Sequence, residues 1–364
     1  MRPLGASSAI ALPGPVALPI SAVAFAIGKR GFMTDQKLDV IGFGNAIVDV
    51  LAKCDDAFLE KFAIPKGGMI LIDGERASAI YAEMAPGVEV SGGSNANAIA
   101  CIASLGGHGG FVGKVAADGL GEIFRHDLRS MGVEYETAPL EGGPDTGRCL
   151  VNVTPDAQRS MATFLGAAGL VTDADIDEAQ IARGEISFFE GYLFEQPDAR
   201  AAFVRACEMA RRHGKRTALT LSDASVIDRQ GAIITDFVRD HIDILLANEA
   251  EATALFESSD LSVIVEKARD LTALTAVTRS EHGSILIPRD GEIVEIAARA
   301  PEALEDTTGA GDAYAAGLLL GLARQYDLET AGALGALAAS EVISHFGARP
   351  AASLKALASE AGLI

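Results

Sequence analysis

Cysteine is scarce in this chain, and its few copies are scattered. The four residues, Cys54, Cys101, Cys149 and Cys207, form no CxxC pair. This spacing argues against a zinc site and against a disulfide framework, and it fits a protein of the reducing cytoplasm. The six histidines form no HExxH or similar spacing, so no dedicated transition-metal site is expected. We expect the cysteines to be small, buried, apolar residues.

Positive charge is also in short supply. The 364 residues include 30 lysine and arginine residues against 50 acidic ones, which gives a formal net charge of -20. Such a surface repels phosphate backbones, so nucleic acid is not an expected partner. A phosphorylated small molecule would have to bind at a local site, built from backbone amides, a helix end, a few cations or a metal ion.

The beginning of the chain lacks both acidic residues and a long apolar run. Residues 1–32 are rich in alanine and proline, and Pro13, Pro15 and Pro19 interrupt the apolar stretches. The unbroken apolar length is too short to span a membrane, so no membrane partner is expected, and the match to a signal peptide is weak. We expect residues 1–34 to form a disordered tail.

The remaining sequence has the composition of a soluble globular protein, with 49% apolar and 22% charged residues. Short apolar runs alternate with helical segments, which predicts an α/β fold with a parallel sheet covered by helices on both faces. Ligands of such sheets bind beyond the carboxyl ends of the strands. The predicted strands are Asp39–Gly44, Gly110–Val115, Ile186–Glu190, Thr217–Ser222, Asp243–Ala247 and Ala273–Thr278, and the predicted helices include Asn95–Leu105 and Gly119–Met131.

Two regions interrupt the alternation. Arg148–Thr154 and Ser160–Leu165 alternate with a period of two and are joined by PDAQR, which predicts a hairpin. Residues 50–90 are read as rich in strands and turns. We expect both regions to form a small β lid. The predicted boundaries are 49–93 and 145–167 for the lid, and 35–48, 94–144 and 168–364 for the large α/β domain with the ATP site.

Two glycine-rich segments resemble nucleotide-binding motifs only in part. GFGNAI begins like a dinucleotide fingerprint but lacks its third glycine. GGHGGFVGKV resembles a P-loop, but His108 stands where the first glycine is needed and Val115 replaces the Ser or Thr that would hold Mg²⁺. An NAD enzyme and a P-loop NTPase are therefore not favoured.

The segment DTTGAGD, Asp306–Asp312, combines small residues with a carboxylate at a helix start. Thr307 or Thr308 is expected to cap the helix, and the amides of the small residues that follow would stay open to an anion. Asp312 could accept a proton from an alcohol while phosphate charge is stabilised beside it, as phosphoryl transfer requires. An ordinary acid in a first helical turn is an equally good reading of this segment alone.

Two further segments favour an active site over an ordinary helix start. Gly92–Asn97, GGSNAN, opens another helix, and its glycines allow a ligand to approach the backbone closely, although Gly-Gly turns before helices are common. In NEAE, Asn248 and Glu251 share one helical face. They suit Mg²⁺ that keeps several of its waters, but they also suit a simple polar helix cap.

Together and in this order, these segments resemble the ribokinase/PfkB family of carbohydrate and nucleoside kinases, from residue 39 to the C-terminus. The resemblance implies a ribokinase-like fold, whose central, mostly parallel sheet is flanked by helices and accompanied by a small β-sheet lid. It implies ATP as co-substrate and Mg²⁺ as cofactor. It also implies residue roles: Asp312 as general base, the amides of Gly309, Ala310 and Gly311 as anion hole, and Asn248 and Glu251 as the Mg²⁺ site, through water.

Among these kinases the most similar segments are those of the adenosine kinases, which phosphorylate the 5′-hydroxyl of adenosine. GNAIVDV and GGSNAN resemble the elements that bind ribose in that group. EGYLFEQP offers Tyr192 or Phe194 for stacking on a base, although an aromatic residue at a strand end is more often part of the core. The substrate-binding residues implied are Asn45, Asp49, Gly92, Gly93, Asn97, Tyr192 and Asp312.

The ATP side of the match is less complete, because Ser280 stands where many relatives have glycine. The ATP-binding residues implied are Asn248, Thr278, Gly283, Gly309 and Gly311. Inosine, guanosine, cytidine, ribose and fructose stay open as acceptors, and so does a sensor that binds a nucleoside without catalysis. The sequence also leaves open whether a monovalent cation assists, and whether the chain is a monomer or a homodimer.

Overall fold

The structure is a computed structural model that describes residues 36–156 and 158–364. The expectation for residues 1–34 lies outside these residues. Among the described residues, no helix has the length and apolar character needed to cross a membrane.

A sheet of eight strands forms the centre of the molecule, in the order β13-β12-β11-β10-β9-β8-β1-β5. All neighbours from β5 to β11 pair in parallel, and β12 and β13 continue the sheet in antiparallel fashion. The parallel sheet predicted from the alternation is therefore confirmed. The strands are β1 (Leu38–Phe43), β5 (Gly109–Val112), β8 (Gly184–Glu190), β9 (Arg216–Thr220), β10 (Ile244–Asn248), β11 (Leu274–Thr278), β12 (Ser284–Pro288) and β13 (Val294–Ile296).

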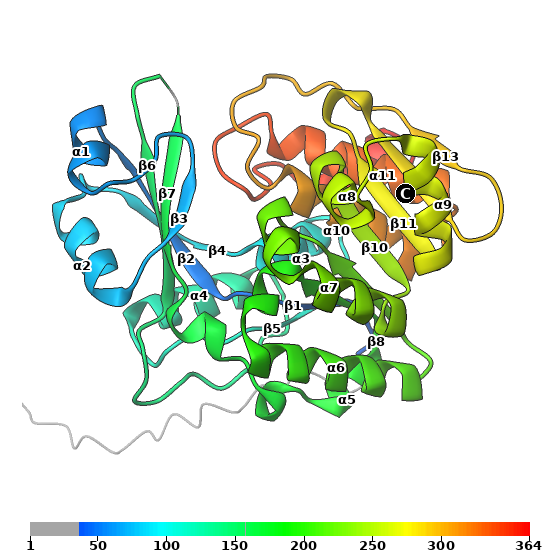
Figure 1. The fold of residues 1–364 in the computed structure, drawn as a ribbon, viewed down its shortest axis with the longest axis horizontal. Coiled ribbons are helices and arrows are strands. Elements are labelled where there is room, and N and C mark those ends of the chain that lie inside the picture. The colour runs from blue at the N-terminus through cyan, green and yellow to red at the C-terminus, as the bar shows by residue number, and fades with distance from the viewer. Residues whose placement is uncertain (1–35, 157) are drawn as a thin grey trace, which may run out of the picture. The chain divides into compact units, whose positions relative to one another are not determined.

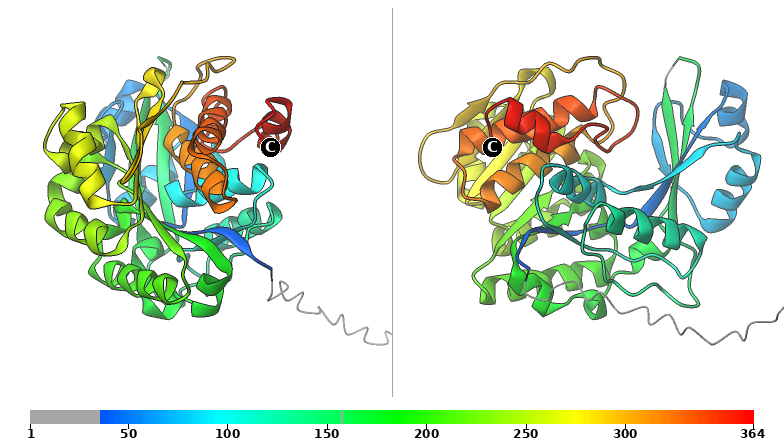
Figure 2. Two further views of the ribbon diagram at one scale, coloured as in Figure 1. Left: turned by 90° about the vertical axis from the view of Figure 1, so that its right-hand side faces the viewer. Right: turned by 180° about the vertical axis from the view of Figure 1, so that it is seen from behind.

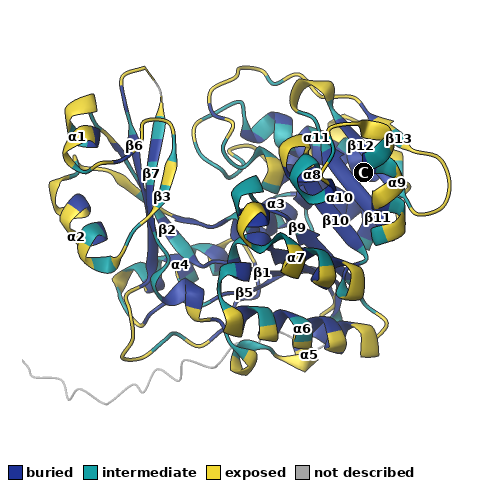
Figure 3. Ribbon diagram, viewed as in Figure 1, coloured by how far each residue is buried: buried dark blue, intermediate teal, exposed yellow. Residues whose placement is uncertain are grey.

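Helices cover both faces of this sheet, as the left view in Figure 2 shows. Successive strand residues point to opposite faces, so Val40 joins one apolar core and Ile41 joins the other. Figure 3 shows the buried strands between the two helical layers. One layer contains α3 (Ser94–Ser104), α4 (Gly119–Ser130), α10 (Ala310–Ala323), α11 (Leu328–Val342) and α12 (Leu354–Glu360). The other contains α5 (Glu178–Arg183), α6 (Pro197–Arg212), α7 (Ala224–His241), α8 (Glu249–Phe256) and α9 (Leu261–Leu271). Short 3-10 helices occupy Gly166–Leu170, Asp173–Asp175, Gly191–Glu195 and Ser280–His282.

A second, five-stranded sheet, here called the small sheet, stands beside the large one (Figure 1). Its order is β3-β7-β6-β2-β4, and β6 and β7 pair as the antiparallel hairpin expected from the sequence. Of the cysteines, Cys54 is half-buried beside this sheet and the other three are buried. The strands are β2 (Ile47–Lys53), β3 (Met69–Leu71), β4 (Val88–Gly92), β6 (Gly147–Val153) and β7 (Arg159–Phe164).

The reading of residues 50–90 as strands and turns was wrong in part, because the segment contains two helices, α1 (Asp56–Lys61) and α2 (Gly74–Glu83). Each helix is started by an aspartate: the Asp55 carboxylate accepts a hydrogen bond from the third helical amide, and Asp73 does the same for α2. Buried apolar residues of both helices pack against one face of the small sheet. Burial of that face stabilises helices too short to persist alone.

Candidate active site

The parallel strands of the large sheet end at one edge, and most of the predicted site residues lie there or on the helices that follow. Glu190, Asn248 and Thr278 are the last residues of β8, β10 and β11. Asn248 and Thr278 are direct neighbours in the sheet register. This is the edge at which parallel α/β sheets bind their ligands.

Asp312 lies in the first turn of α10, where it meets the first turn of α3. Its Oδ1 accepts a hydrogen bond from the Ser94 hydroxyl at 2.7 Å, and its Oδ2 accepts one from the Asn97 side-chain amide at 3.2 Å. Burial raises the pKa of Asp312 to about 6, and these two hydrogen bonds oppose that rise. The carboxylate is therefore ionised at neutral pH, with a pKa close enough to neutrality for proton transfer.

The start of α10 differs from the expectation, because neither Thr307 nor Thr308 caps the helix. Gly309 is the N-cap residue, in the left-handed conformation at φ 80°, and makes no side-chain cap. A Cβ at this position would lie 2.7 Å from the Cβ of Ala348, so both the backbone and the space require glycine. The Thr308 side chain instead donates to the Asp306 carboxylate at 2.7 Å.

Open amides remain at this helix start. The amide of Ala310 donates to the Thr307 carbonyl at 3.3 Å. The amides of Gly309 and Gly311 have no acceptor within the described residues. Two donors at the positive end of a helix suit an anion, and they lie beside the Asp312 carboxylate.

Asp49 projects from β2 over the glycine turn before α3. A Cβ on Gly92 would come within 2.4 Å of the Asp49 carboxylate, so the missing side chain makes room for that acid. Gly93 has φ 95°, and a Cβ there would lie 2.1 Å from the Asn45 carbonyl oxygen. Burial raises the pKa of Asp49 to about 6, Arg349 and Arg159 lower it, and Asp312 raises it again. The two carboxylates therefore belong to one electrostatic site.

Asn45 is held by Glu190, an acid that the sequence reasoning did not single out. The backbone and side-chain amides of Asn45 donate to Glu190 Oε1 at 2.8 and 2.5 Å, and the Asn95 amide donates to Oε2 at 3.1 Å. Burial raises the pKa of Glu190 to about 7, against these hydrogen bonds. The side-chain carbonyl oxygen of Asn45 is buried and has no donor in the part of the chain that is described.

The two aromatic candidates differ in their surroundings. Phe194 is fully buried and packs against Phe203 and Phe237 in the core. Tyr192 is half-buried, and burial raises its pKa well above the usual range, with the charges of Asp223 and Asp312 adding to the rise. Tyr192 therefore packs against the apolar core while lying within electrostatic reach of Asp312.

Asn248 and Glu251 form a capping box at the start of α8. Asn248 Oδ1 accepts from the Glu251 amide at 2.8 Å, and the Glu251 carboxylate accepts from the backbone and side-chain amides of Asn248 at 3.0 and 2.8 Å. Burial raises the pKa of Glu251 to about 7, and the charges of Asp223 and Asp312 contribute to that rise. Asn248 and Glu251 therefore do cap α8, and Glu251 also lies within electrostatic reach of Asp312.

The side chains available near Asn248 and Glu251 limit how a metal ion could bind there. No cluster of three or more His, Cys, Asp or Glu residues suited to a metal occurs among the described residues. Both oxygens of Glu251 already accept hydrogen bonds. The pair therefore fits Mg²⁺ held through its waters.

Gly283, one of the predicted ATP-binding residues, must be glycine. It has φ 78°, and a Cβ there would lie 2.0 Å from the Ile296 carbonyl oxygen.

Arg159, which the sequence reasoning did not identify, links the small sheet to the loop before α10. It lies at the start of β7 and forms an ion pair with Asp306 at 2.8 Å and a hydrogen bond to the Thr308 hydroxyl at 2.7 Å. Its guanidinium also lies 4.2 Å from the centre of the Phe346 ring. A fixed cation therefore stands on the loop that leads to the open amides of α10.

Comparison with known proteins gives consistent matches. Residues 73–355 match the family described as pfkB family carbohydrate kinase. The solved structure of adenosine kinase from Sinorhizobium meliloti is 45% identical, with a TM-score of 0.84 over 89% of this chain and 99% of that one. The probable sugar kinase protein from Rhizobium etli CFN 42 is 40% identical, with a TM-score of 0.85 over 90% and 100%. Adenosine kinase 2 of Arabidopsis thaliana is 24% identical, over 85% of this chain and 94% of that protein.

Proposed function

The chain belongs to the pfkB family of carbohydrate kinases, and we propose that it phosphorylates the 5′-hydroxyl of adenosine with ATP, giving AMP and ADP. It has the ribokinase-like α/β fold of this family and is a phosphotransferase that acts on a hydroxyl group. One observation carries the proposal for the site: the Asp312 carboxylate is held by Ser94 and Asn97 beside the open amides of α10.

In the proposed reaction, Asp312 accepts the proton of the attacking hydroxyl. The amides of Gly309 and Gly311 stabilise the charge that develops on the transferred phosphoryl group, together with the helix dipole. Asp49 accepts hydrogen bonds from two ribose hydroxyls, and the free oxygen of Asn45 accepts another.

Mg²⁺, held through water near Asn248 and Glu251, would supply charge neutralisation at the phosphates. The proposed ATP side of the site contains Thr278, the last residue of β11, and Gly283, which directly precedes β12.

We propose that the small sheet is the lid of the enzyme, built from residues 49–93 and 145–167. Arg159 supports this role, because it already connects the sheet to Asp306 beside the anion-binding helix start. A sheet held over the acceptor pocket would exclude water, so that the nucleoside hydroxyl and not water attacks the phosphate.

The choice of adenosine rests on the similarity to adenosine kinases and on Tyr192, a half-buried aromatic residue within electrostatic reach of Asp312. The relative from Rhizobium etli, a probable sugar kinase, keeps a sugar as the main alternative. We expect release of ADP to be fastest with adenosine in a panel that also contains inosine, guanosine, cytidine, ribose and fructose. A higher kcat/KM with a free sugar would reject adenosine as the acceptor. Binding of a nucleoside without ADP release would favour the sensor.

Replacing Gly92 by alanine tests the acceptor pocket. The new Cβ would displace the Asp49 carboxylate, so the KM for the acceptor should rise tenfold or more, equivalent to about 1.4 kcal/mol of lost binding. Gly119→Ala is the matched control, because a Cβ there meets nothing within 4 Å. Steady-state kinetics of both variants provide the measurement, and an unchanged acceptor KM in Gly92→Ala would place the acceptor elsewhere.

A further inference from the structure

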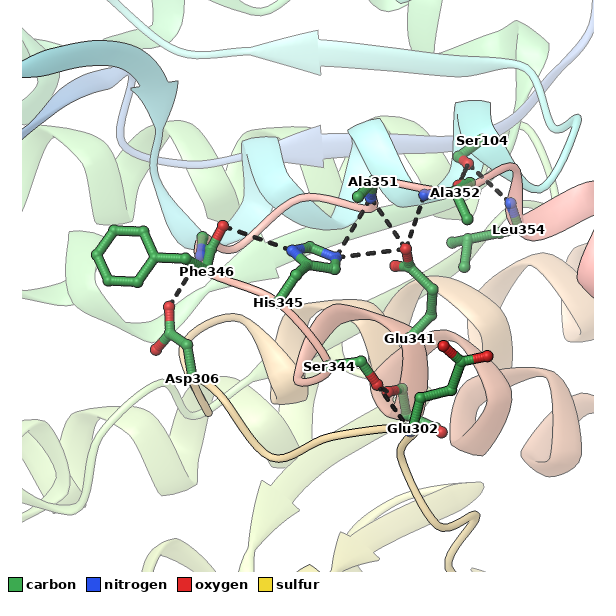
Figure 4. A network of polar contacts seen from close by, with 12 residues as sticks. Ser104, Glu302, Asp306, Glu341, Ser344, His345, Phe346, Ala351, Ala352 and Leu354 are labelled. Atoms are coloured by element: carbon green, nitrogen blue, oxygen red, sulfur yellow. Dashed lines mark hydrogen bonds and ion pairs between the residues drawn. The ribbon is translucent and has the colours of Figure 1, made fainter. Parts of the chain in front are cut away.

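Residues 346–353 form a loop between α11 and α12 that is fixed by an extensive polar network (Figure 4). Glu341 Oε1 accepts hydrogen bonds from the amides of Ala351 and Ala352 at 3.0 and 2.7 Å, and it also contacts His345. The Ser104 hydroxyl, on α3, accepts from the Leu354 amide at 3.1 Å. Such a loop can hold a side chain in one position, because its backbone amides have defined partners on two helices.

The network also reaches the anion-binding region. The amide of Gly347 donates to Asp306 Oδ2 at 2.9 Å, the same carboxylate oxygen that pairs with Arg159. Ala348 packs against Gly309, the residue that starts α10. The loop therefore contacts the start of α10 on one side and α3 on the other.

The side chain that this loop presents to the acceptor pocket is Arg349. Its Nε donates to Asn97 Oδ1 at 3.2 Å, and its Nη1 donates to the Ser91 hydroxyl. The third nitrogen, Nη2, is buried and has no hydrogen-bond partner among the described residues. Ser91 lies next to Gly92, over which the Asp49 carboxylate is placed. The guanidinium therefore bonds to two residues that adjoin the acids of the site: Ser91 precedes Gly92, and Asn97 bonds to Asp312.

The contact with Asn97 determines how that amide is oriented. A side-chain amide has one accepting end and one donating end, and a guanidinium can only donate. With its oxygen toward Arg349, Asn97 must turn its NH₂ group away, and this group donates to Asp312 Oδ2 at 3.2 Å. Arg349 thus acts on the proposed base through one intervening residue.

The charges around Arg349 also support a role for it in the acceptor pocket. Arg349 faces Asp49 from β2, Asp127 from α4 and Cys101 from α3. Asp49 in turn faces Arg349, Arg159 and Asp312, and the buried Cys149 of β6 lies near it. Arginine stays protonated even when buried, so it supplies a permanent positive charge to this acidic pocket.

We infer that Arg349 is a positioning residue of the acceptor pocket, which orients the Asn97 amide toward Asp312 and places a fixed positive charge opposite Asp49. The inference deepens the proposed function and rests on it for the identity of the bound hydroxyl compound. It assigns to the segment after α11 a part in phosphoryl transfer that no local motif indicates.

The kinetic test compares Arg349→Met and Arg349→Lys across pH. In Arg349→Met, kcat/KM for the acceptor should fall about 100-fold, and its acid limb should move to higher pH because Asp49 loses a charge that lowers its pKa. Arg349→Lys keeps the charge but loses the planar fork, so its acid limb should stay in place while kcat falls. Arg324→Met, which removes a guanidinium bound to Asp39 outside the pocket, is the control and should leave the acid limb unmoved.

A titration separates this inference from the proposed function. We expect ¹³C NMR of the aspartate carboxyl groups, with the Asp49 signal assigned from Asp49→Asn, to show a higher pKa for Asp49 in Arg349→Met than in wild type. This measurement needs no turnover, so it stands even if the wild-type protein phosphorylates none of the acceptors and the proposed function fails. An unchanged Asp49 pKa, or an acid limb that moves equally in Arg324→Met, would overturn the inference.

Discussion

Asp312→Asn lowers kcat by about 10² to 10⁴-fold, the usual contribution of a general base, while the affinity for the acceptor stays near that of wild type. Asparagine keeps the size of the side chain and can still accept from Ser94, but it cannot take the proton of the attacking hydroxyl. The measurement is single-turnover phosphoryl transfer together with binding of the acceptor by calorimetry.

Two controls accompany this result. Asp327→Asn changes a carboxylate of the same kind at the N-cap of α11, where asparagine caps equally well, so its kcat should equal that of wild type. Stability gives the second control. The folded pKa of Asp312 is about 6, above its ordinary value of 3.8, so the ionised form destabilises the fold above pH 6, and this cost disappears as the pH falls toward 4. Asp312→Asn should therefore unfold no earlier than wild type at pH 7.5. Retention of wild-type kcat would remove Asp312 from its proposed role.

Arg159→Met is expected to lower kcat/KM for ATP by about 10² to 10³-fold, comparable to the loss of one oxyanion donor. The substitution removes the cation beside the open amides and the connection from the small sheet to Asp306 and Thr308. Because methionine keeps the apolar length of the side chain, contact with the Phe346 ring is retained in part. Initial rates at varied ATP concentration check this expectation.

The matched control lies in the same sheet region. Arg76 is on α2, and its guanidinium donates to the carbonyl oxygens of Phe62 and Ala63, away from the loop before α10. Arg76→Met should reduce the stability of the helix packing without changing kcat/KM for ATP. If both variants lose activity to the same extent, the effect of Arg159 is one of sheet stability, and its proposed role at the phosphate is wrong.

The parallel part of the large sheet could be predicted because its signals are local, whereas its antiparallel strands β12 and β13 were not predicted. Each buried strand is a short apolar run, and period-two alternation also identified the hairpin of β6 and β7. Helices α1 and α2 were missed because each is short and only partly apolar. Their start signals, Asp55 and Asp73, were present in the sequence, but the whole segment was read as strands and turns.

The site was predictable where function is written into consecutive residues, as at Asp312 and at Gly92 and Gly93. Arg159, Glu190 and Arg349 were not predictable in this way. Each is a single charged residue whose role depends on a partner far away in the chain, and a lone arginine has no local pattern. The mistaken threonine cap has a different cause. Glycine at position 309 adopts a left-handed conformation, which starts the helix later than the threonines would.

The hydrogen bond between Asn97 and Asp312 joins residues 215 positions apart, and that between Ser91 and Arg349 joins residues 258 apart. Contacts of such long range close large loops, so they form late in folding, after local helices and hairpins. A refolding chain would therefore regain its helical signal before any of its activity. For the proposed kinase, activity therefore depends on contacts between residues 91–97 and residues 312–349, which only the folded chain brings together.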